Sequence, residues 1–313
     1  MSELKATREA YGATLLELLE EGLDVVAVDA DLSGSTTTAK LGKADPGRLI
    51  NVGIAEQNMM GIAAGLSLSG KLVFTGSFAV FATGRAYDQV RNTICYAGLN
   101  VKIAPTHAGL SVGADGGSHQ MVEDIALMRV LPNMRVMVPA DYTSAKAALR
   151  IAANTPGPVY VRMGRASVPV LYDELEGFEL GKARVLRTGS DATIVACGVE
   201  VDFALKAADS LFEQGVDVEV IDAFSIKPLD EATILASIHK TGVVVTAEEH
   251  SIIGGLGSAV AELIAEKAPN VLRAPLKRIG VQDRFGTSGT MDELFREYEL
   301  DVQALCAAVV SLR

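Results

Sequence analysis

Short runs of β-branched residues that alternate with helix-length segments constrain the fold of this chain most strongly. The run 25–29, Val-Val-Ala-Val-Asp, predicts a buried strand, because β-branched side chains suit pleated, covered backbone. The segment before it, 7–21, has apolar residues at helical spacing. Repetition of such a pair along a chain is typical of a parallel, doubly wound α/β sheet. Ligands of these sheets bind at the carboxyl ends of the strands.

The alternation predicts two α/β domains in the 313 residues. Residues 166–190 interrupt it with a proline, an acidic pair and glycines, which indicates a linker. We therefore expect a doubly wound first domain at 1–168, a linker at 169–190 and a doubly wound second domain at 191–313. The main expected strands lie at 25–29, 49–52, 72–74, 101–104, 136–138, 159–162, 192–197, 216–221 and 243–246. The main expected helices lie at 7–21, 57–69, 81–97, 144–153, 202–214, 257–267, 291–298 and 301–310.

The charge balance narrows the class of partner. With 28 basic and 39 acidic residues the net charge is −11, which argues against nucleic acids and anionic membranes. No apolar run approaches the roughly 20 residues of a membrane span, and residues 1–6 lack the apolar core of a signal peptide. Three cysteines, far apart and without metal-type spacing, indicate a reduced compartment. We expect a cytoplasmic protein that binds a small molecule and supplies no metal ligands itself.

Glu56 is the only charged residue in the segment 52–65, which is otherwise rich in Gly, Ala, Ile and Met. A carboxyl in such surroundings loses hydration, so its ionisation becomes costly. Protonatable groups in dry sites often do chemistry. The alternative is an ordinary residue of a first helical turn, where the helix dipole favours an acid. The local pattern leaves both interpretations open.

A glycine-rich loop at 104–120 follows a predicted strand and holds two of the four histidines, His107 and His119, together with Asp115. Glycines let the backbone approach a ligand, and histidines can donate hydrogen bonds or move protons. A flexible loop whose histidines cap nearby backbone is the alternative. Two histidines and an aspartate at a strand end favour a site.

Two further groups are candidates. Arg162 ends a predicted strand, where an arginine could bind phosphate, and Arg8 and Arg165 form a set with it. An ordinary ion pair is the default for one isolated arginine. Phe78 and Phe81, at a strand-to-helix junction, suit either a core or a platform for a flat heterocycle.

Three motifs in order resemble the C-terminal section of a split transketolase. They are Gly-Ile-Ala-Glu-Gln-Asn-Met at 53–59, Phe-x-x-Phe at 78–81 with Arg-Ala-Tyr-Asp-Gln-Val-Arg at 85–91, and Gly-Ala-Asp-Gly-x-Ser-His-Gln at 113–120. The resemblance covers nearly the whole chain. It implies a pyrimidine-binding domain followed by a transketolase C-terminal domain. It also implies thiamine diphosphate as cofactor.

The resemblance implies roles for the predicted residues. Glu56 matches the glutamate that hydrogen-bonds N1′ of the cofactor's aminopyrimidine and so activates it. Phe78 or Phe81 matches the aromatic that stacks on that ring, with Arg85 beside it. Four steps separate Phe81 from Arg85, where common transketolases have three.

The sugar-binding residues follow from the same resemblance. His119 is expected to contact the donor's C1 hydroxyl, Asp115 the adjacent hydroxyl, and His107 the sugar or its phosphate. Glu56, His119 and His107 are the expected catalytic residues. The family's phosphate-binding positions are matched by Arg8, Ser35 and Arg162.

One family motif is missing. Full-length transketolases carry Gly-Asp-Gly and a later Asn in a domain that binds diphosphate and metal, and this chain has no Gly-Asp-Gly. The expected enzyme therefore needs an N-terminal-section subunit that holds the diphosphate and Mg²⁺ (or Ca²⁺ or Mn²⁺), in an α2β2 heterotetramer. It would transfer a ketol group from a ketose to an aldose, and phosphorylated sugars are the expected substrates. The alternatives are a 2-oxoacid dehydrogenase β subunit, an enzyme like deoxyxylulose-phosphate synthase, and a non-catalytic subunit that kept the fold.

Overall fold

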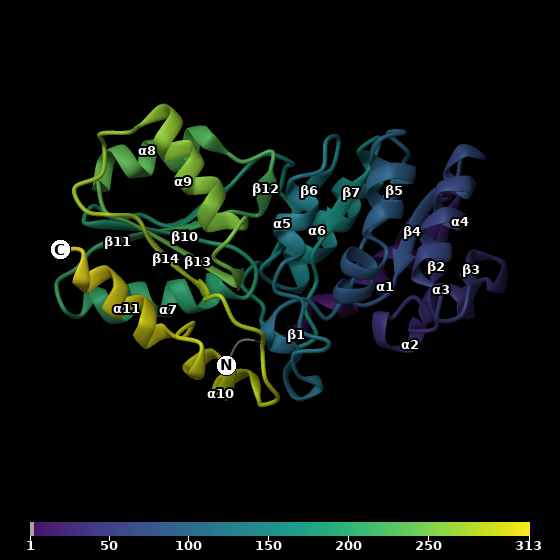
Figure 1. The fold of residues 1–313 in the computed structure, drawn as a ribbon, viewed down its shortest axis with the longest axis horizontal. Helices are drawn as coiled ribbons and strands as arrows, with labels where there is room; N and C mark the ends of the chain where they lie inside the picture. The colour runs from purple at the N-terminus through teal and green to yellow at the C-terminus, as the bar shows by residue number, and fades with distance from the viewer. Residues whose placement is uncertain (1–2) are drawn as a thin grey trace.

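A computed structural model describes residues 3–313 as two α/β units that lie side by side (Figure 1). The purple-to-teal N-terminal half forms one unit and the green-to-yellow C-terminal half forms the other. The two larger hydrophobic clusters of the core contain residues from the two halves, such as Val138 with Cys197 in one of them. The two units therefore share a continuous apolar interior. Within the described part of the chain, no helix combines the length and apolarity that a membrane crossing requires.

The N-terminal half is built on parallel strands, and the inner strands β2, β4, β5 and β7 are buried on both faces, as the β-branched runs predict. All five residues of β2 are buried, for example. The strands are β2 (Val25–Asp29), β3 (Leu49–Asn51), β4 (Leu72–Gly76), β5 (Val101–Ile103), β6 (Arg135–Met137) and β7 (Val159–Val161). The helices are α1 (Thr7–Glu20), α2 (Ser33–Thr36), α3 (Ala39–Ala44), η1 (Pro46–Arg48), α4 (Glu56–Leu68), η2 (Val80–Arg85), η3 (Gln89–Cys95), η4 (Leu110–Asp115), α5 (Asp124–Arg129) and α6 (Tyr142–Asn154).

The C-terminal half repeats the pattern around a five-stranded sheet of order β14-β13-β10-β11-β9. Its strands are parallel except β9, which pairs antiparallel with β11 at the edge. The strands are β9 (Arg184–Arg187), β10 (Ala192–Ala196), β11 (Val218–Asp222), β13 (Val244–Ser251) and β14 (Lys277–Val281). The helices are α7 (Glu200–Phe212), α8 (Glu231–Thr241), α9 (Leu256–Lys267), α10 (Met291–Glu297) and α11 (Val302–Ser311).

One strand crosses from the second half into the first sheet. β12 (Ser225–Lys227) pairs antiparallel with β6, so the first sheet has the order β12-β6-β7-β5-β4-β2-β3 (Figure 1). Lys227 strengthens the crossing, because its Nζ donates to the carbonyls of Arg129 and Leu131 at the end of α5, at 2.9 and 2.5 Å. A cation at a helix carboxyl end satisfies orphan carbonyls and complements the helix dipole. The wholly parallel first sheet that the sequence suggested therefore has one antiparallel edge.

The expected linker at 169–190 is packed along much of its length. β8 (Ser167–Pro169) pairs with β1 (Leu4–Ala6), and β9 already belongs to the second sheet. Between them, the amides of Leu171 and Tyr172 donate to Oδ2 of Asp141, and Tyr172 Oη donates to Asp222 at 2.6 Å. These contacts join the segment to both halves.

The helix expected at 81–97 is interrupted and widened. The amide of Ala86 donates to the carbonyl of Phe81, and that of Tyr96 to Arg91, so both bonds span five residues instead of four. Such π-type turns accommodate an extra residue and are frequent at functional sites. The extra step between Phe81 and Arg85 lies within the first of them.

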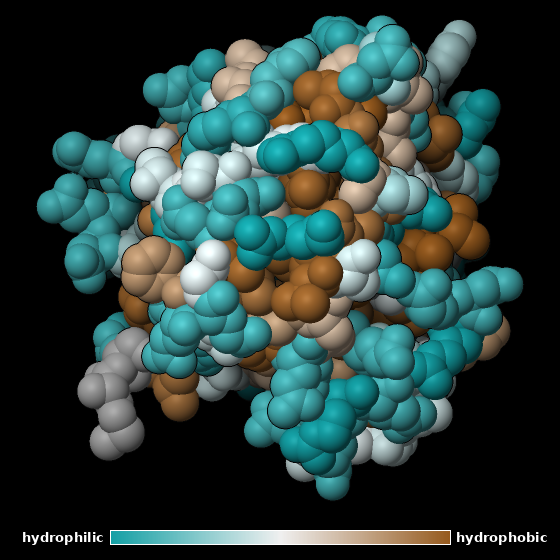
Figure 2. All heavy atoms as spheres, turned by 90° about the vertical axis from the view of Figure 1, so that its left-hand side faces the viewer, coloured by the Kyte–Doolittle hydropathy of each residue, from teal (hydrophilic) through white to brown (hydrophobic). Residues whose placement is uncertain are grey.

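On the face of the molecule formed by the C-terminal half, hydrophilic side chains dominate the rim and apolar side chains gather between them (Figure 2). Long cations cover apolar rings on this half. Arg187 lies over Phe212 with 5.2 Å between guanidinium carbon and ring centroid, and Lys206 lies over Phe203. Their apolar stems shield surface while the charges stay hydrated.

Candidate functional site

The predicted site residues gather at one edge of the first sheet. Five parallel strands, β3, β2, β4, β5 and β7, end there, and each is followed by a segment with candidate residues. Glu56 follows β3, Ser35 follows β2, and the two phenylalanines follow β4. The histidine loop follows β5. This is the carboxyl edge, where parallel sheets bind ligands.

Glu56 is the first residue of α4 and its side chain is only 3% exposed. Arg85 Nη1 donates to Glu56 Oε1 at 2.9 Å, while Gln57 Nε2 donates to the Arg85 carbonyl at 3.2 Å. The Arg85 side chain is 51% exposed, so it covers the carboxylate from the solvent side. The sequence predicted a carboxyl in apolar surroundings without a partner. Glu56 is buried as predicted, but the prediction lacked its ion pair with Arg85.

The two phenylalanines have different surroundings. Phe78 is buried and stacks on His107, with ring centroids 3.7 Å apart. Phe81 is half-buried, lies 6.0 Å from Phe78, and has Arg85 over its face at 4.4 Å. The wide turn after Phe81 lets Arg85 contact both this ring and Glu56. Phe81 is thus the ring that a ligand beside Glu56 could reach.

The histidines form a second part of the same edge. His107 is buried, adopts a φ of 60° and shares a 2.7 Å hydrogen bond between Nδ1 and Thr106 Oγ1. Burial, and to a smaller extent the neighbouring Arg8, Arg165 and His119, together lower the pKa of His107 to about 3. Its imidazole is therefore neutral at neutral pH.

His119 and Asp115 lie at the more accessible end of the loop. His119 is half-buried and packs edge-on against Phe81, with centroids 5.5 Å apart. Its Nδ1 shares a 2.9 Å hydrogen bond with Ser118 Oγ. The side chain of Asp115, at the end of η4, is exposed. The loop thus offers one neutral buried imidazole and two accessible polar groups.

Two arginines supply positive charge near His107. Arg8 Nη1 donates to the Ser35 carbonyl at 3.0 Å, so the chain brings these two predicted residues together. Arg165 Nη1 donates to the carbonyl of Val112 at 2.6 Å. Both guanidiniums are close enough to depress the pKa of His107. The site therefore contains two positively charged side chains near His107, those of Arg8 and Arg165.

Arg162, which the sequence placed among the substrate-binding residues, follows β7 at this edge but is buried and bonded to other residues of the protein. Its side chain is 4% exposed, and Nε donates to Asp124 Oδ2 at 2.8 Å. Nη1 and Nη2 donate to the Glu249 side chain and carbonyl, and Nη2 also reaches the Met121 carbonyl. These bonds engage four of the five N–H donors of the guanidinium, and its burial keeps it from the fork-like contact by which arginine binds a phosphate. Arg165, which the sequence analysis grouped with Arg162, is therefore the better candidate for binding a substrate phosphate.

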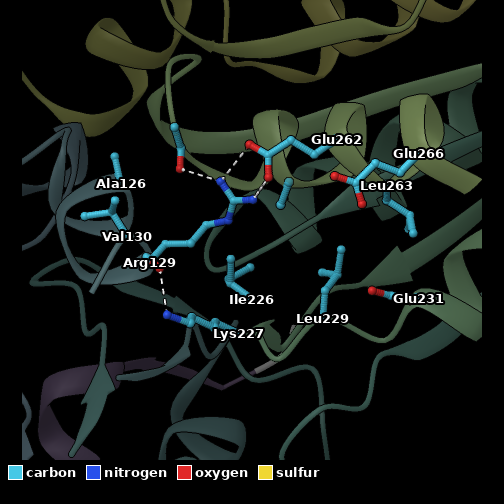
Figure 3. A pocket seen from close by; sticks show the side chains of 12 residues that line it. Ala126, Arg129, Val130, Ile226, Lys227, Leu229, Glu231, Glu262, Leu263 and Glu266 are labelled. Atoms are coloured by element: carbon cyan, nitrogen blue, oxygen red, sulfur yellow. Dashed lines mark hydrogen bonds and ion pairs between the residues drawn. The ribbon is translucent and has the colours of Figure 1, made fainter. Parts of the chain in front are cut away.

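A large cavity exists away from these residues. A space of about 630 Å³ lies between α5 and α9, lined by apolar side chains and acids (Figure 3). Its cations are engaged, because Arg129 bonds Glu262 at 3.1 Å and Lys227 caps α5. None of its lining residues belongs to the predicted site. Cavity size alone would therefore have pointed away from the convergent polar groups at the sheet edge.

Comparison with known families agrees with this arrangement. The model of the transketolase pyrimidine binding domain matches residues 3–170, and that of the transketolase C-terminal domain matches residues 181–305. The chain therefore belongs to the transketolase family, whose enzymes depend on thiamine diphosphate. The resemblance and the α/β fold predicted from the sequence are confirmed.

Individual relatives match almost end to end. The "Putative transketolase C-terminal section" of Methanocaldococcus jannaschii is 50% identical over 308 residues, 98% of this chain and 96% of that protein. A 6-deoxy-6-sulfo-D-fructose transketolase subunit of a Clostridium species is 43% identical over 301 residues, 96% of this chain and 92% of that protein. The structure of a split-gene transketolase, an inactive β4 tetramer, aligns with a TM-score of 0.88 at 50% identity and covers 98% of this chain and 97% of that one.

Proposed function

We propose that this chain is a subunit of a thiamine diphosphate-dependent transketolase, which transfers a two-carbon ketol group from a ketose to an aldose. One observation carries the proposal. A buried carboxyl, an accessible aromatic face and a loop with two histidines and an aspartate converge at a single sheet edge. A family fold without such a cluster would fit a non-catalytic subunit equally well.

The residues present suit the aminopyrimidine of the cofactor, a flat heterocycle with a basic ring nitrogen. Glu56 would hydrogen-bond that nitrogen, and Phe81 would stack on the ring. Arg85 now bonds the carboxylate and covers the aromatic face. Its half-exposed guanidinium must therefore move aside when the cofactor binds.

Bound thiamine diphosphate supplies the nucleophilic carbon that takes up the two-carbon unit. The task of Glu56 is to hydrogen-bond the pyrimidine nitrogen, and the burial of its side chain keeps water from competing for that bond. His107, neutral because burial lowers its pKa, exchanges hydrogen bonds with the sugar without adding charge. His119 and Asp115 would contact the hydroxyls next to the reacting carbonyl.

The far end of the substrate would meet Arg8 and Arg165, with Ser35 beside Arg8. Guanidinium groups bind tetrahedral oxyanions through paired hydrogen bonds. A phosphorylated ketose fits this chemistry. The Clostridium relative is named for a sulfonated ketose, so a terminal sulfonate is the second candidate.

We further propose that a separate chain holds the diphosphate and the Mg²⁺, in a cytoplasmic α2β2 assembly. The sequence has no Gly-Asp-Gly. The M. jannaschii relative, which matches this chain along nearly its whole length, is named as a C-terminal section. Both observations support a two-chain enzyme.

Co-expression tests the proposal. The chain is purified alone and together with the product of a neighbouring reading frame that contains Gly-Asp-Gly followed by Asn. Each sample receives thiamine diphosphate, Mg²⁺, fructose 6-phosphate and a panel of aldoses, and products are identified by mass spectrometry. A ketose two carbons longer than the aldose is expected from the complex only.

Other outcomes separate the alternatives. Turnover by the chain alone would contradict the need for a partner. A complex that decarboxylates a 2-oxoacid and passes the acyl group to lipoamide, without ketol transfer, would support the dehydrogenase alternative.

A further inference from the structure

The loop that carries His107, Asp115 and His119 is held in place by the other half of the chain. Glu249 lies on β13 of the C-terminal half and is only 4% exposed. The amide of Ser111 donates to Glu249 Oε2 at 3.0 Å, and Ser111 Oγ donates to Oε1 at 3.2 Å. One carboxylate thus binds the loop twice, across 138 residues of sequence.

The approach of the loop to this carboxylate is unusually close. Gly109 has a φ of +79°, and a Cβ at this position would lie 2.2 Å from the carboxyl carbon of Glu249. The Gly109 amide also donates to the Met121 carbonyl at 2.8 Å, which closes the base of the loop. Only glycine combines this φ with this contact.

Glu249 is itself fixed. Arg162 Nη1 lies 3.5 Å from Glu249 Oε1, and Nη2 donates to the Glu249 carbonyl at 3.1 Å. Arg162 is in turn held by Asp124, so the carboxylate belongs to a buried ionic cluster. A buried hydrogen-bonded network of this kind makes the groups that belong to it more rigid.

The contact between Glu249 and Ser111 also affects Arg165, one of the two arginines proposed to bind the substrate. Ser111 precedes Val112, whose carbonyl accepts the hydrogen bond from Arg165 Nη1. A shift of Ser111 would therefore displace the anchor of Arg165. A second tie strengthens the loop, since Gln120 Nε2 donates to Leu110 and Gly113 inside the loop and to Thr287 of the C-terminal half at 2.9 Å.

We propose that Glu249 is a positioning residue, which sets the sugar-binding geometry of the loop 107–119 through Ser111. That Glu249 holds the loop in place is argued from the contacts alone. That this affects substrate binding rests on the proposed ketol transfer.

The reconstituted complex tests the effect on substrate binding. With fructose 6-phosphate as donor, Glu249→Gln should lower kcat/KM roughly 10- to 100-fold, mainly by raising the donor KM, because a misplaced binding group costs about that much. Affinity for thiamine diphosphate should change less than threefold. Ser111→Ala should shift the donor KM in the same direction by a smaller factor. The double variant should be less impaired than the product of the two single effects.

Glu248→Gln is the matched control. Glu248 is the preceding residue of the same strand and is also buried, but it accepts from the amides of Leu256 and Gly257 at the start of α9, at 2.7 and 2.8 Å. Its loss should destabilise the chain without raising the donor KM. Equal rises in KM for both variants would reduce Glu249 to a general stabiliser and overturn the proposal.

Hydrogen exchange of the purified chain tests, without any activity, whether Glu249 holds the loop in place. Amides 109–119 should exchange about tenfold faster in Glu249→Gln, whereas Glu248→Gln should accelerate 256–260 instead. Unchanged exchange in the loop overturns the positioning role. If the wild-type complex shows no ketol transfer, only the proposed function is refuted. The hydrogen-exchange result still decides whether Glu249 positions the loop. If Glu249→Gln does not fold, both measurements are made on Ser111→Ala. The proposal is overturned if that variant has the hydrogen exchange and the donor KM of the wild type.

Discussion

Replacing Glu56 by Gln separates the chemistry of this residue from its structural role. The change keeps the shape of the side chain and removes its charge. The lost ion pair has one buried partner and one, Arg85, that is 51% exposed, so solvent screens it. Such pairs contribute about 0.2–1 kcal/mol, and the free energy of unfolding should change by no more than about 1 kcal/mol. Turnover should fall roughly 10²- to 10⁴-fold, because an amide cannot hold and return the proton.

The assay compares urea unfolding of the isolated chain with ketol transfer by the complex. Glu219→Gln is the control, since Glu219 is also buried, pairs with the half-exposed Lys240, and lies on β11 of the other sheet. It should show a similar change in stability with full turnover. Two results would refute the reasoning: turnover of Glu56→Gln within tenfold of wild type, or a loss of several kcal/mol in stability, which would make the residue structural.

Three more outcomes are expected. Phe78→Ala, in the core, should cost about 3–5 kcal/mol of stability in urea unfolding, whereas Phe81→Ala should cost less and weaken thiamine diphosphate binding to the complex by about 0.5–1.5 kcal/mol in calorimetry. The pKa of His107 is about 3 in the folded protein and 6.5 for an ordinary histidine. Between pH 3 and pH 6.5 the unfolded chain therefore binds more protons at this residue than the folded one. Its contribution to stability is complete above pH 6.5 and is lost as pH falls, by up to about 1.4 kcal/mol per unit, and His107→Asn should flatten a urea series from pH 4 to 7. Gly109→Ala should destabilise by more than about 1 kcal/mol, while Gly61→Ala, which meets open space on α4, should stabilise the isolated chain by about 0.5–1 kcal/mol.

Features encoded by local pattern were predictable. The expected strand at 25–29 coincides with β2, and the helix expected at 57–69 differs from α4 by one residue at each end. The candidate loops lie together because parallel strands end at the same edge, a rule that needs only the order of elements. This is why Glu56, Phe81 and His119 could be grouped before their contacts were known.

Features that depend on distant pairing were not predictable. The antiparallel pairing of β9 and β12 follows from where the chain returns in space, which periodicity does not encode. Arg162 was assigned to phosphate because it follows a strand, but its main partners include Glu249, 87 residues further on. The countercharge on Glu56 likewise comes from Arg85, across a turn whose width no propensity predicts.

The crossing strand β12 has a consequence for how this protein can be produced in parts. A chain truncated near residue 190 would contain every residue of the proposed site but would lack β12, which covers the edge of β6. An uncovered edge strand pairs readily with other chains. The fragment should therefore aggregate, although the family boundaries at 170 and 181 suggest a separable domain. We therefore expect that residues 1–190 are not a folding unit by themselves, because β12 joins the two halves of this chain through the first sheet.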